Sequence, residues 1–177
     1  SIPNSFKYID GDLYAVSFNR SVAVQVAENE WKNLVSKNDL DVPTDKTIAG
    51  FESIDGFNKN DLYAVGGKSD LWHFNGQQWR QIQLPTNIDM FTVCCAGDGY
   101  VYLGGTMGTI WYGRDNKWQL LENPEFTIPY RNMVWYQDRV WCTSDYGLWC
   151  IKNQQLIRPT DVPDEVLLCS GSLSVGD

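Results

Sequence analysis

The stretch DLYAVGGKSDLWHFNGQQWRQI, residues 61–82, contains the pattern that decides the fold. A short apolar run at residues 62–65 is followed by the pair Gly66–Gly67, which can adopt the positive φ of a tight reversal. Two further apolar runs, at residues 71–74 and 79–82, are separated by a polar turn. Three short runs joined by two turns predict three antiparallel strands in a meander.

The same pattern recurs with a fixed spacing along the chain. Leu62, Val101 and Val140 lie 39 residues apart, and Trp79 and Trp118 repeat this spacing. Four-stranded antiparallel units with a period near 40 residues are the sequence signature of a β-propeller. We therefore predict an all-β fold, a β-propeller of about four four-stranded antiparallel blades. A β-sandwich also has closely spaced strands, but it does not explain the recurring Trp and glycine turn.

The repeats predict a single propeller domain over residues 1–177. The first repeat is degenerate, and a polar insertion at residues 36–48 separates it from the second. After the fourth repeat, residues 164–177 are expected either to begin a fifth repeat, as in a fragment of a longer array, or to supply a closing strand. The four blades are predicted at residues 1–35, 49–83, 90–122 and 130–158.

The charge balance bears on the class of partner. Asp and Glu number 22 against 14 Lys and Arg, which gives a formal net charge of −8. This disfavours nucleic acid as a ligand, because binding to phosphates requires clustered basic residues. A basic protein is the complementary partner, since opposite charges steer association. The alternative is that the charge only maintains solubility. No apolar run is long enough for a transmembrane helix, so no membrane association is expected.

The five cysteines are odd in number and contain no C-x-x-C pair. This predicts neither a disulfide framework nor a zinc site. A reducing compartment, and hence a cytoplasmic location, is expected. Cys142 and Cys150 could face each other across one hairpin, which leaves a disulfide between them as the alternative.

Two motifs resemble known propeller repeats. Tyr63 to Gly67 followed by Trp79, and Tyr102 to Gly105 followed by Trp118, resemble the diglycine, aromatic and Trp pattern of kelch repeats. Residues 143–149, TSDYGLW, are similar to the Asp box of sialidase-type propellers. The resemblance implies a propeller architecture, and because these motifs are structural in both families it implies no catalytic residue.

Catalytic and metal chemistry find little support in the residue types. His73 is the only histidine, and it lies within a predicted strand, where a packed or surface residue is expected rather than a catalytic base. Asp39, Asp41 and Asp45 lack the Gly and Glu of a calcium loop, so a solvated loop is predicted there. We therefore predict no catalytic residue, no metal site and no cofactor.

Carboxylate pairs leave glycan cleavage as an alternative. Most of the candidates lie in turns at corresponding points of successive repeats, where Asp accepts hydrogen bonds from turn amides. A sialidase site requires a cluster of arginines. The arginines of this chain do not recur in one register that would bring them together. The candidate carboxylates are Asp10, Asp12, Asp61, Asp98, Asp138 and Asp145.

The remaining function is binding through loops. The turns between the second and third strands of each repeat are expected to form one binding end, and exposed aromatics are preferred anchors in interfaces. We predict a non-enzymatic scaffold that binds another protein, in the manner of an acidic neutralising or immunity protein with a basic partner. The alternatives are a carbohydrate-binding or glycan-cleaving module and a structural segment of a larger extracellular array. The predicted binding residues are Phe18, Arg20, Lys68, Asp70, Met107, Tyr130, Asp145 and Tyr146.

Overall fold

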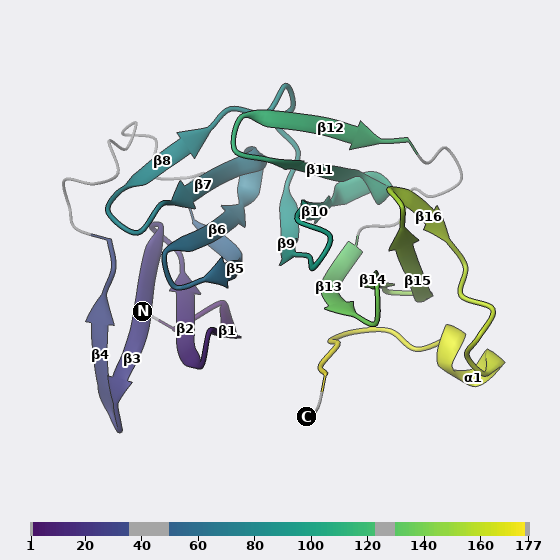
Figure 1. Ribbon diagram of the computed structural model, residues 1–177, viewed down its shortest axis with the longest axis horizontal. Helices are drawn as coiled ribbons and strands as arrows, with labels where there is room; N and C mark the ends of the chain where they lie inside the picture. The colour runs from purple at the N-terminus through teal and green to yellow at the C-terminus, as the bar shows by residue number, and fades with distance from the viewer. Residues whose placement is uncertain (1, 36–49, 123–129, 176–177) are drawn as a thin grey trace. The chain divides into compact units, whose positions relative to one another are not determined.

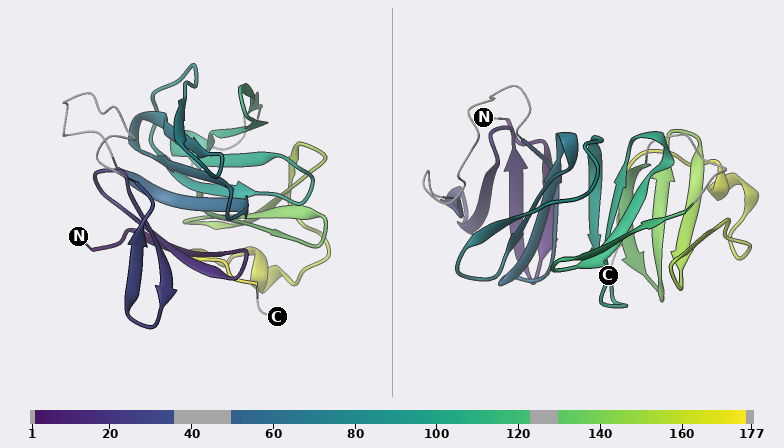
Figure 2. Two further views of the ribbon diagram at one scale, coloured as in Figure 1. Left: turned by 60° about the vertical axis from the view of Figure 1, so that its left-hand side comes forward. Right: turned by 90° about the horizontal axis from the view of Figure 1, so that it is seen from above.

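The computed structural model of the protein describes residues 2–35, 50–122 and 130–175 (Figure 1). These residues form four sheets, each with four antiparallel strands paired in chain order. The predicted all-β propeller fold with four four-stranded blades is confirmed. Each meander can be followed from further directions in Figure 2.

The strands occur where alternating apolar residues and turn residues predict them. The first sheet consists of β1 (Ser5–Ile9), β2 (Asp12–Ser17), β3 (Ser21–Ala27) and β4 (Glu30–Asn33). The second consists of β5 (Phe51–Asn58), β6 (Asp61–Gly66), β7 (Asp70–Phe74) and β8 (Trp79–Ile82). The third consists of β9 (Met90–Cys95), β10 (Val101–Gly105), β11 (Ile110–Arg114) and β12 (Lys117–Leu121). The fourth consists of β13 (Tyr130–Tyr136), β14 (Arg139–Ser144), β15 (Gly147–Lys152) and β16 (Gln155–Ile157).

The segment after the fourth sheet differs from its prediction. Residues 164–177 were expected to begin a fifth repeat or to supply a closing strand, but the chain forms the short helix α1 (Asp164–Leu167), and residues 168–175 contain no strand. Asp164 and Glu165 occupy the first turn of α1, where acidic side chains interact favourably with the helix dipole. This interaction, directly after Pro163, favours a helical turn over an extended strand at the start of the apolar run 166–169.

The chain divides into two compact units, residues 1–90 and 91–177, which we call the N-terminal and C-terminal units. In the N-terminal unit, Tyr14 and Val22 of the first sheet share one buried core with Phe51, Ile54 and Leu62 of the second. The burial of apolar side chains between neighbouring sheets is the main stabilising contribution.

The core of the C-terminal unit follows the same principle. Cys94 and Ile110 of the third sheet share a core with Met133, Val140 and Cys142 of the fourth. The positions of the 39-residue period are all completely buried, and two of them, Leu62 and Val140, belong to the cores of their units. The third, Val101, is also completely buried.

The diglycine pairs have a different role from the one predicted. Gly66 is extended, with φ −161°, and the positive φ values of this turn belong to Lys68 and Ser69. A Cβ atom on Gly66 would collide with the carbonyl group of Gly50, and one on Gly104 would lie 2.8 Å from Met133. The first glycine of each pair therefore permits close packing against a neighbouring segment rather than the reversal itself.

The cysteines are free thiols, and the two on the β14–β15 hairpin are out of register. Cys142 is opposite Trp149, and Cys150 is opposite Trp141. Neighbouring positions on a strand point to opposite faces, so the predicted alternative in which Cys142 and Cys150 face each other is wrong. Burial raises the pKa of the Cys142 thiol well above its usual value, which makes this thiol unreactive.

Candidate functional site

The turn between the second and third strands of each sheet is the most regular candidate site, and we call these four segments the middle turns. They comprise residues 18–20, 67–69, 106–109 and 145–146. In the first three, two consecutive residues have positive φ: Asn19 and Arg20, Lys68 and Ser69, Met107 and Gly108. Two consecutive left-handed residues are typical of type I′ turns, whose twist matches that of the flanking strands.

Each middle turn presents at least one predicted binding residue to solvent. Phe18, Lys68, Met107 and Tyr146 are all exposed, and the exposed fraction is 59% for Phe18, 69% for Met107 and 71% for Tyr146. Three of these four side chains are large and apolar or aromatic. Their exposure in the same turn of each meander is the strongest feature of the predicted set.

Two hydrogen bonds fix the backbone of the second middle turn around Lys68. The Lys68 N–H donates to Asp89 Oδ1 at 2.9 Å, and the neighbouring Ser69 hydroxyl donates to the Ile88 carbonyl at 3.0 Å. These bonds fix the second middle turn against residues 88–89 and leave the Lys68 side chain directed to solvent. The turn therefore presents a positive charge on a constrained backbone.

Arg20 and Asp70 lie in a different environment from the exposed four. Both are buried and form a bidentate ion pair, with Arg20 Nε 2.6 Å from Asp70 Oδ2 and Arg20 Nη2 2.9 Å from Asp70 Oδ1. Trp72 Nε1 also donates to Asp70 Oδ1 at 2.9 Å, and the Trp72 ring lies under the guanidinium group at 5.2 Å. The pair joins the first middle turn to β7, and its burial contradicts the expectation that these two side chains are presented to a partner.

The predicted exposure of Tyr130 is also wrong. Tyr130 was expected to be an exposed anchor, but it is 1% exposed and belongs to the core of the C-terminal unit. It begins β13, and its pairing with Ser144 is followed by a register shift before Asn132. Tyr130 is the first residue of β13, and its ring packs inside the unit with the other residues of this core.

Asp145 remains at the surface with a partner that the sequence did not indicate. Arg131 donates to both carboxylate oxygens of Asp145, at 3.1 Å and 3.2 Å. The Arg131 guanidinium also lies over the ring of Phe91 at 5.0 Å. This exposed pair holds the fourth middle turn, which presents Tyr146, against β13.

His73 and the turn carboxylates form local contacts. His73 Nε2 is 2.7 Å from Asp61 Oδ1, and its ring stacks on Tyr63 at 4.3 Å. Asp98 accepts from the Tyr102 hydroxyl at 2.7 Å and from the Tyr100 amide at 3.0 Å. The His73–Asp61 pair was missed, because the two residues are brought together by the β6–β7 pairing and not by sequence proximity.

Within residues 2–35, 50–122 and 130–175, no three His, Cys, Asp or Glu side chains are grouped so that they could hold a metal ion. The candidate aspartates 39, 41 and 45 lie outside the described residues. In the part of the chain that the structure describes, no helix has the length and hydrophobicity needed to span a bilayer.

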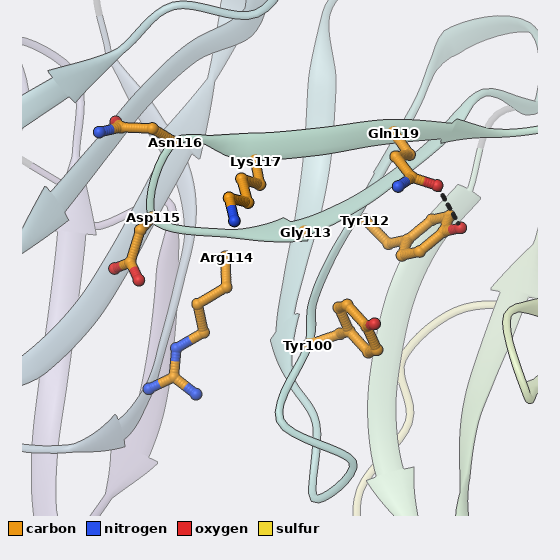
Figure 3. A pocket seen from close by; sticks show the side chains of 8 residues that line it. All are labelled: Tyr100, Tyr112, Gly113, Arg114, Asp115, Asn116, Lys117 and Gln119. Carbon is orange, nitrogen blue, oxygen red and sulfur yellow. Dashed lines mark hydrogen bonds between the residues drawn. The ribbon is translucent and has the colours of Figure 1, made fainter.

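A pocket of about 460 Å³ lies on the third sheet, beside the β11–β12 hairpin (Figure 3). Tyr100 and Tyr112 form one wall, with their rings nearly perpendicular and 5.5 Å apart. Tyr112 donates to Gln119 at 2.9 Å, and Lys117 lines the pocket from β12 (Figure 3). Burial and the bond to Asp98 raise the pKa of Tyr102, which stacks behind Tyr112, so its hydroxyl stays neutral. The sequence analysis did not identify this pocket.

No family model matches the chain, so the kelch-type resemblance stays a prediction. Over 157 residues the chain is 29% identical to the immune protein Tsi7 of Pseudomonas aeruginosa, covering 89% of this chain and 51% of Tsi7. The chain thus spans about half the length of this curated relative.

Solved structures with the same fold have lower sequence identity. A virginiamycin B lyase from Staphylococcus aureus matches 91% of this chain and 56% of its own, with a TM-score of 0.66 and 10% identity. YCF48 from Cyanidioschyzon merolae matches 90% and 55%, with a TM-score of 0.63 and 11% identity. The WD40 repeats of RRP9 match 86% and 50%, with a TM-score of 0.59 and 16% identity. At these identities the likeness concerns the propeller fold alone.

Proposed function

We propose that this protein is a non-enzymatic, immunity-type protein that binds and neutralises another protein through its middle turns. The observation that carries the proposal is the similarity to the immune protein Tsi7 over 89% of the chain. The cytoplasmic location expected from the free cysteines is part of the same proposal.

In each unit, the exposed middle-turn residues provide contacts with the partner in this proposal. Phe18, Met107 and Tyr146 are apolar or aromatic side chains on short, conformationally defined turns. A turn whose backbone conformation is already defined loses little conformational entropy on binding, which favours affinity. The buried Arg20–Asp70 pair supports the surface indirectly, because it fixes the first middle turn.

The net charge of −8 supports a basic partner. Long-range attraction would raise the rate of association and weaken with added salt. Neutralisation by a non-enzymatic protein needs only occlusion of the partner. It therefore requires no catalytic residue.

The test is an affinity pull-down from a lysate of the source cell, with wild-type protein and the variants Tyr146→Ala and Tyr136→Ala as baits. Tyr136 is a matched control, because it is an exposed tyrosine outside the middle turns. We expect one basic protein to be retained by the wild type and by Tyr136→Ala, with at least a tenfold weaker Kd for Tyr146→Ala when the purified partner is titrated. Equal binding by all three baits, or no protein partner, would contradict the proposal.

Carbohydrate binding is the second candidate function, and the pocket on the third sheet favours it. Two tyrosine rings can stack on the apolar face of a sugar, while Gln119 and Lys117 provide hydrogen-bonding groups beside them. Binding of wild-type protein to a glycan array, lost in Tyr100→Ala, would support this function instead. Tyr146→Ala is the control here, because it leaves the pocket unchanged.

A further inference from the structure

Four residues of the β11–β12 hairpin form a square at the pocket of the third sheet. Strand pairing places Tyr112 opposite Gln119 and Arg114 opposite Lys117. Partners across two strands lie about 5 Å apart, and residues two apart on one strand share a face and lie about 7 Å apart. The square is therefore about as large as one sugar ring with its substituents, and all four residues line the same pocket (Figure 3).

The pocket is formed inside the C-terminal unit. Tyr102 and Ile110 belong to the core that the third and fourth sheets share, and Tyr112 packs against this core. Because Tyr112 pairs with Tyr102 across β10 and β11, the square lies on the face of the third sheet that the fourth sheet partly covers. Every residue that lines the pocket belongs to this one compact unit.

Hydrogen bonds hold the turn that carries Tyr100 in place. The Tyr100 N–H donates to Asp98 Oδ1 at 3.0 Å, and the Tyr100 carbonyl accepts from the Ala96 N–H at 2.9 Å. Arg114 Nη1 donates to the Gly99 carbonyl at 3.1 Å, which ties the same turn to β11. A binding surface whose backbone is already ordered loses little conformational entropy when a ligand arrives. The pocket is therefore prepared for a ligand with a flat or apolar ring face.

Lys117 gives the pocket an uncompensated positive charge. Its side chain is exposed, and the ammonium group makes no hydrogen bond or ion pair with any residue that the structure describes. Arg114 and Asp115 also line the pocket, and their opposite charges cancel. Lys117 lies between Asp115 and Gln119 along the hairpin (Figure 3). A single free cation beside tyrosine rings favours a ligand that combines a ring with one negative charge.

We propose that this pocket binds an acidic saccharide, with one uronate ring against Tyr100 and Tyr112 and its carboxylate paired with Lys117. This ligand class rests on carbohydrate binding, the second candidate function. Gln119 Oε1 accepts from the Tyr112 hydroxyl, so the amide nitrogen of Gln119 can donate to a sugar hydroxyl. One uncompensated cation matches a carboxylate better than a phosphate ester, which carries about two negative charges.

NMR titration of the wild-type chain with two methyl glycosides, of galacturonic acid and of galactose, tests the proposal. The two probes differ only in a carboxylate that replaces a hydroxymethyl group. We expect the uronate to bind roughly fivefold more tightly, which is the effect of one ion pair at a solvated site. This preference should shrink with added salt, and the amide shifts should change at residue 100 and at residues 112–119.

Three variants assign the roles within the pocket. Lys117→Gln removes the charge and should make the two glycosides bind equally. Lys59→Gln is the matched control, because Lys59 is an exposed lysine in another hairpin turn, and it should keep the preference for the uronate. Tyr100→Ala should weaken the binding of both glycosides roughly tenfold, through the loss of a stacked ring. Thermal unfolding verifies that the variants are folded, as expected for substitutions at exposed positions.

The outcomes separate the ligand class from the functions proposed above. Equal binding of the two glycosides by the wild type, lost in Tyr100→Ala, would overturn the acidic ligand and leave carbohydrate binding in place. A preference for the uronate that persists in Lys117→Gln would overturn the role of Lys117. Binding of neither glycoside would overturn both the acidic ligand and the second candidate function. The immunity-type function is tested separately, through Tyr146 and a protein partner.

Discussion

Two arginine–aspartate pairs secure middle turns, one in each unit, and they differ mainly in exposure. Arg20 and Asp70 have exposed fractions of 7% and 6%, whereas those of Arg131 and Asp145 are 42% and 49%. Both are bidentate, but the buried contacts measure 2.6 Å and 2.9 Å and the exposed ones 3.1 Å and 3.2 Å. The N-terminal unit thus holds a buried pair that joins two sheets, and the C-terminal unit holds a solvent-screened pair within one sheet.

The energetic difference follows from solvation. A charge that is left buried without its partner keeps its full desolvation penalty, so breaking a buried pair is costly. An exposed pair is screened by water and salt, and its rupture leaves both ions solvated. The comparison therefore predicts an order of effects, which starts with the loss of the buried carboxylate.

Asp70→Ala should have the largest effect, a loss of about 3–5 kcal/mol in the free energy of unfolding. The change removes the acceptor of Arg20, Trp72 and Gln81 together. Urea unfolding followed by fluorescence measures it, with Asp145→Ala as the matched control. Equal losses in the two variants would show that burial does not distinguish the pairs.

Trp72→Phe should have an intermediate effect, a loss of about 1.5 kcal/mol. It deletes the indole N–H bond to Asp70 but retains a ring under the Arg20 guanidinium. Trp118→Phe is the control, because its indole N–H bonds to the Asp115 carbonyl at an exposed site. The same unfolding experiment compares them, and a smaller loss for Trp72→Phe than for Trp118→Phe would contradict the prediction.

Arg131→Ala and Asp145→Ala should each cost less than about 1 kcal/mol, and the cost should shrink with added salt. A double-mutant cycle at low and high salt isolates the coupling between the two side chains. The same double-mutant cycle on Arg20 and Asp70 provides the comparison. Equal coupling energies for the two pairs would contradict the prediction that the buried pair is the stronger one.

The smallest effect concerns acid stability at another exposed network. The hydrogen bond from Lys152 lowers the pKa of Asp138, and the bond from Arg139 lowers the pKa of Asp161. A lowered folded-state pKa contributes stability that is present above about pH 4 and is lost as the pH falls further. Asp138→Asn should therefore slightly flatten the decline of stability between about pH 4 and pH 2, measured by urea midpoints. An unchanged slope would contradict this assignment.

The fold could be predicted largely from the sequence. Alternating residues and recurring turns define the strands, and the 39-residue spacing of Leu62, Val101 and Val140 reflects corresponding buried positions. The prediction failed after the fourth sheet, where described residues 164–175 contain no strand and residues 164–167, directly after Pro163, form a short helix. An apolar run alone does not determine which secondary structure it adopts.

The candidate site was less predictable, because side-chain burial depends on long-range contacts. Phe18 and Arg20 are two residues apart in one turn, yet Phe18 is exposed and Arg20 reaches Asp70 across 50 positions of sequence. The sequence does not reveal this contact, since it depends on the stacking of the first sheet on the second. The Tyr100–Tyr112 pocket was missed because the sequence does not show how aromatic rings on neighbouring segments of one sheet are oriented.

The distribution of free thiols has a practical consequence for following how the molecule opens. All five cysteines belong to the C-terminal unit, where Cys94, Cys142 and Cys150 are buried and Cys169 is exposed. An alkylating reagent should modify Cys169 at once and reach the buried sulfur atoms only during transient unfolding. The rate at which the buried thiols are alkylated therefore reports the opening of the C-terminal unit. The N-terminal unit contains no cysteine, so its opening is not detected by this reaction.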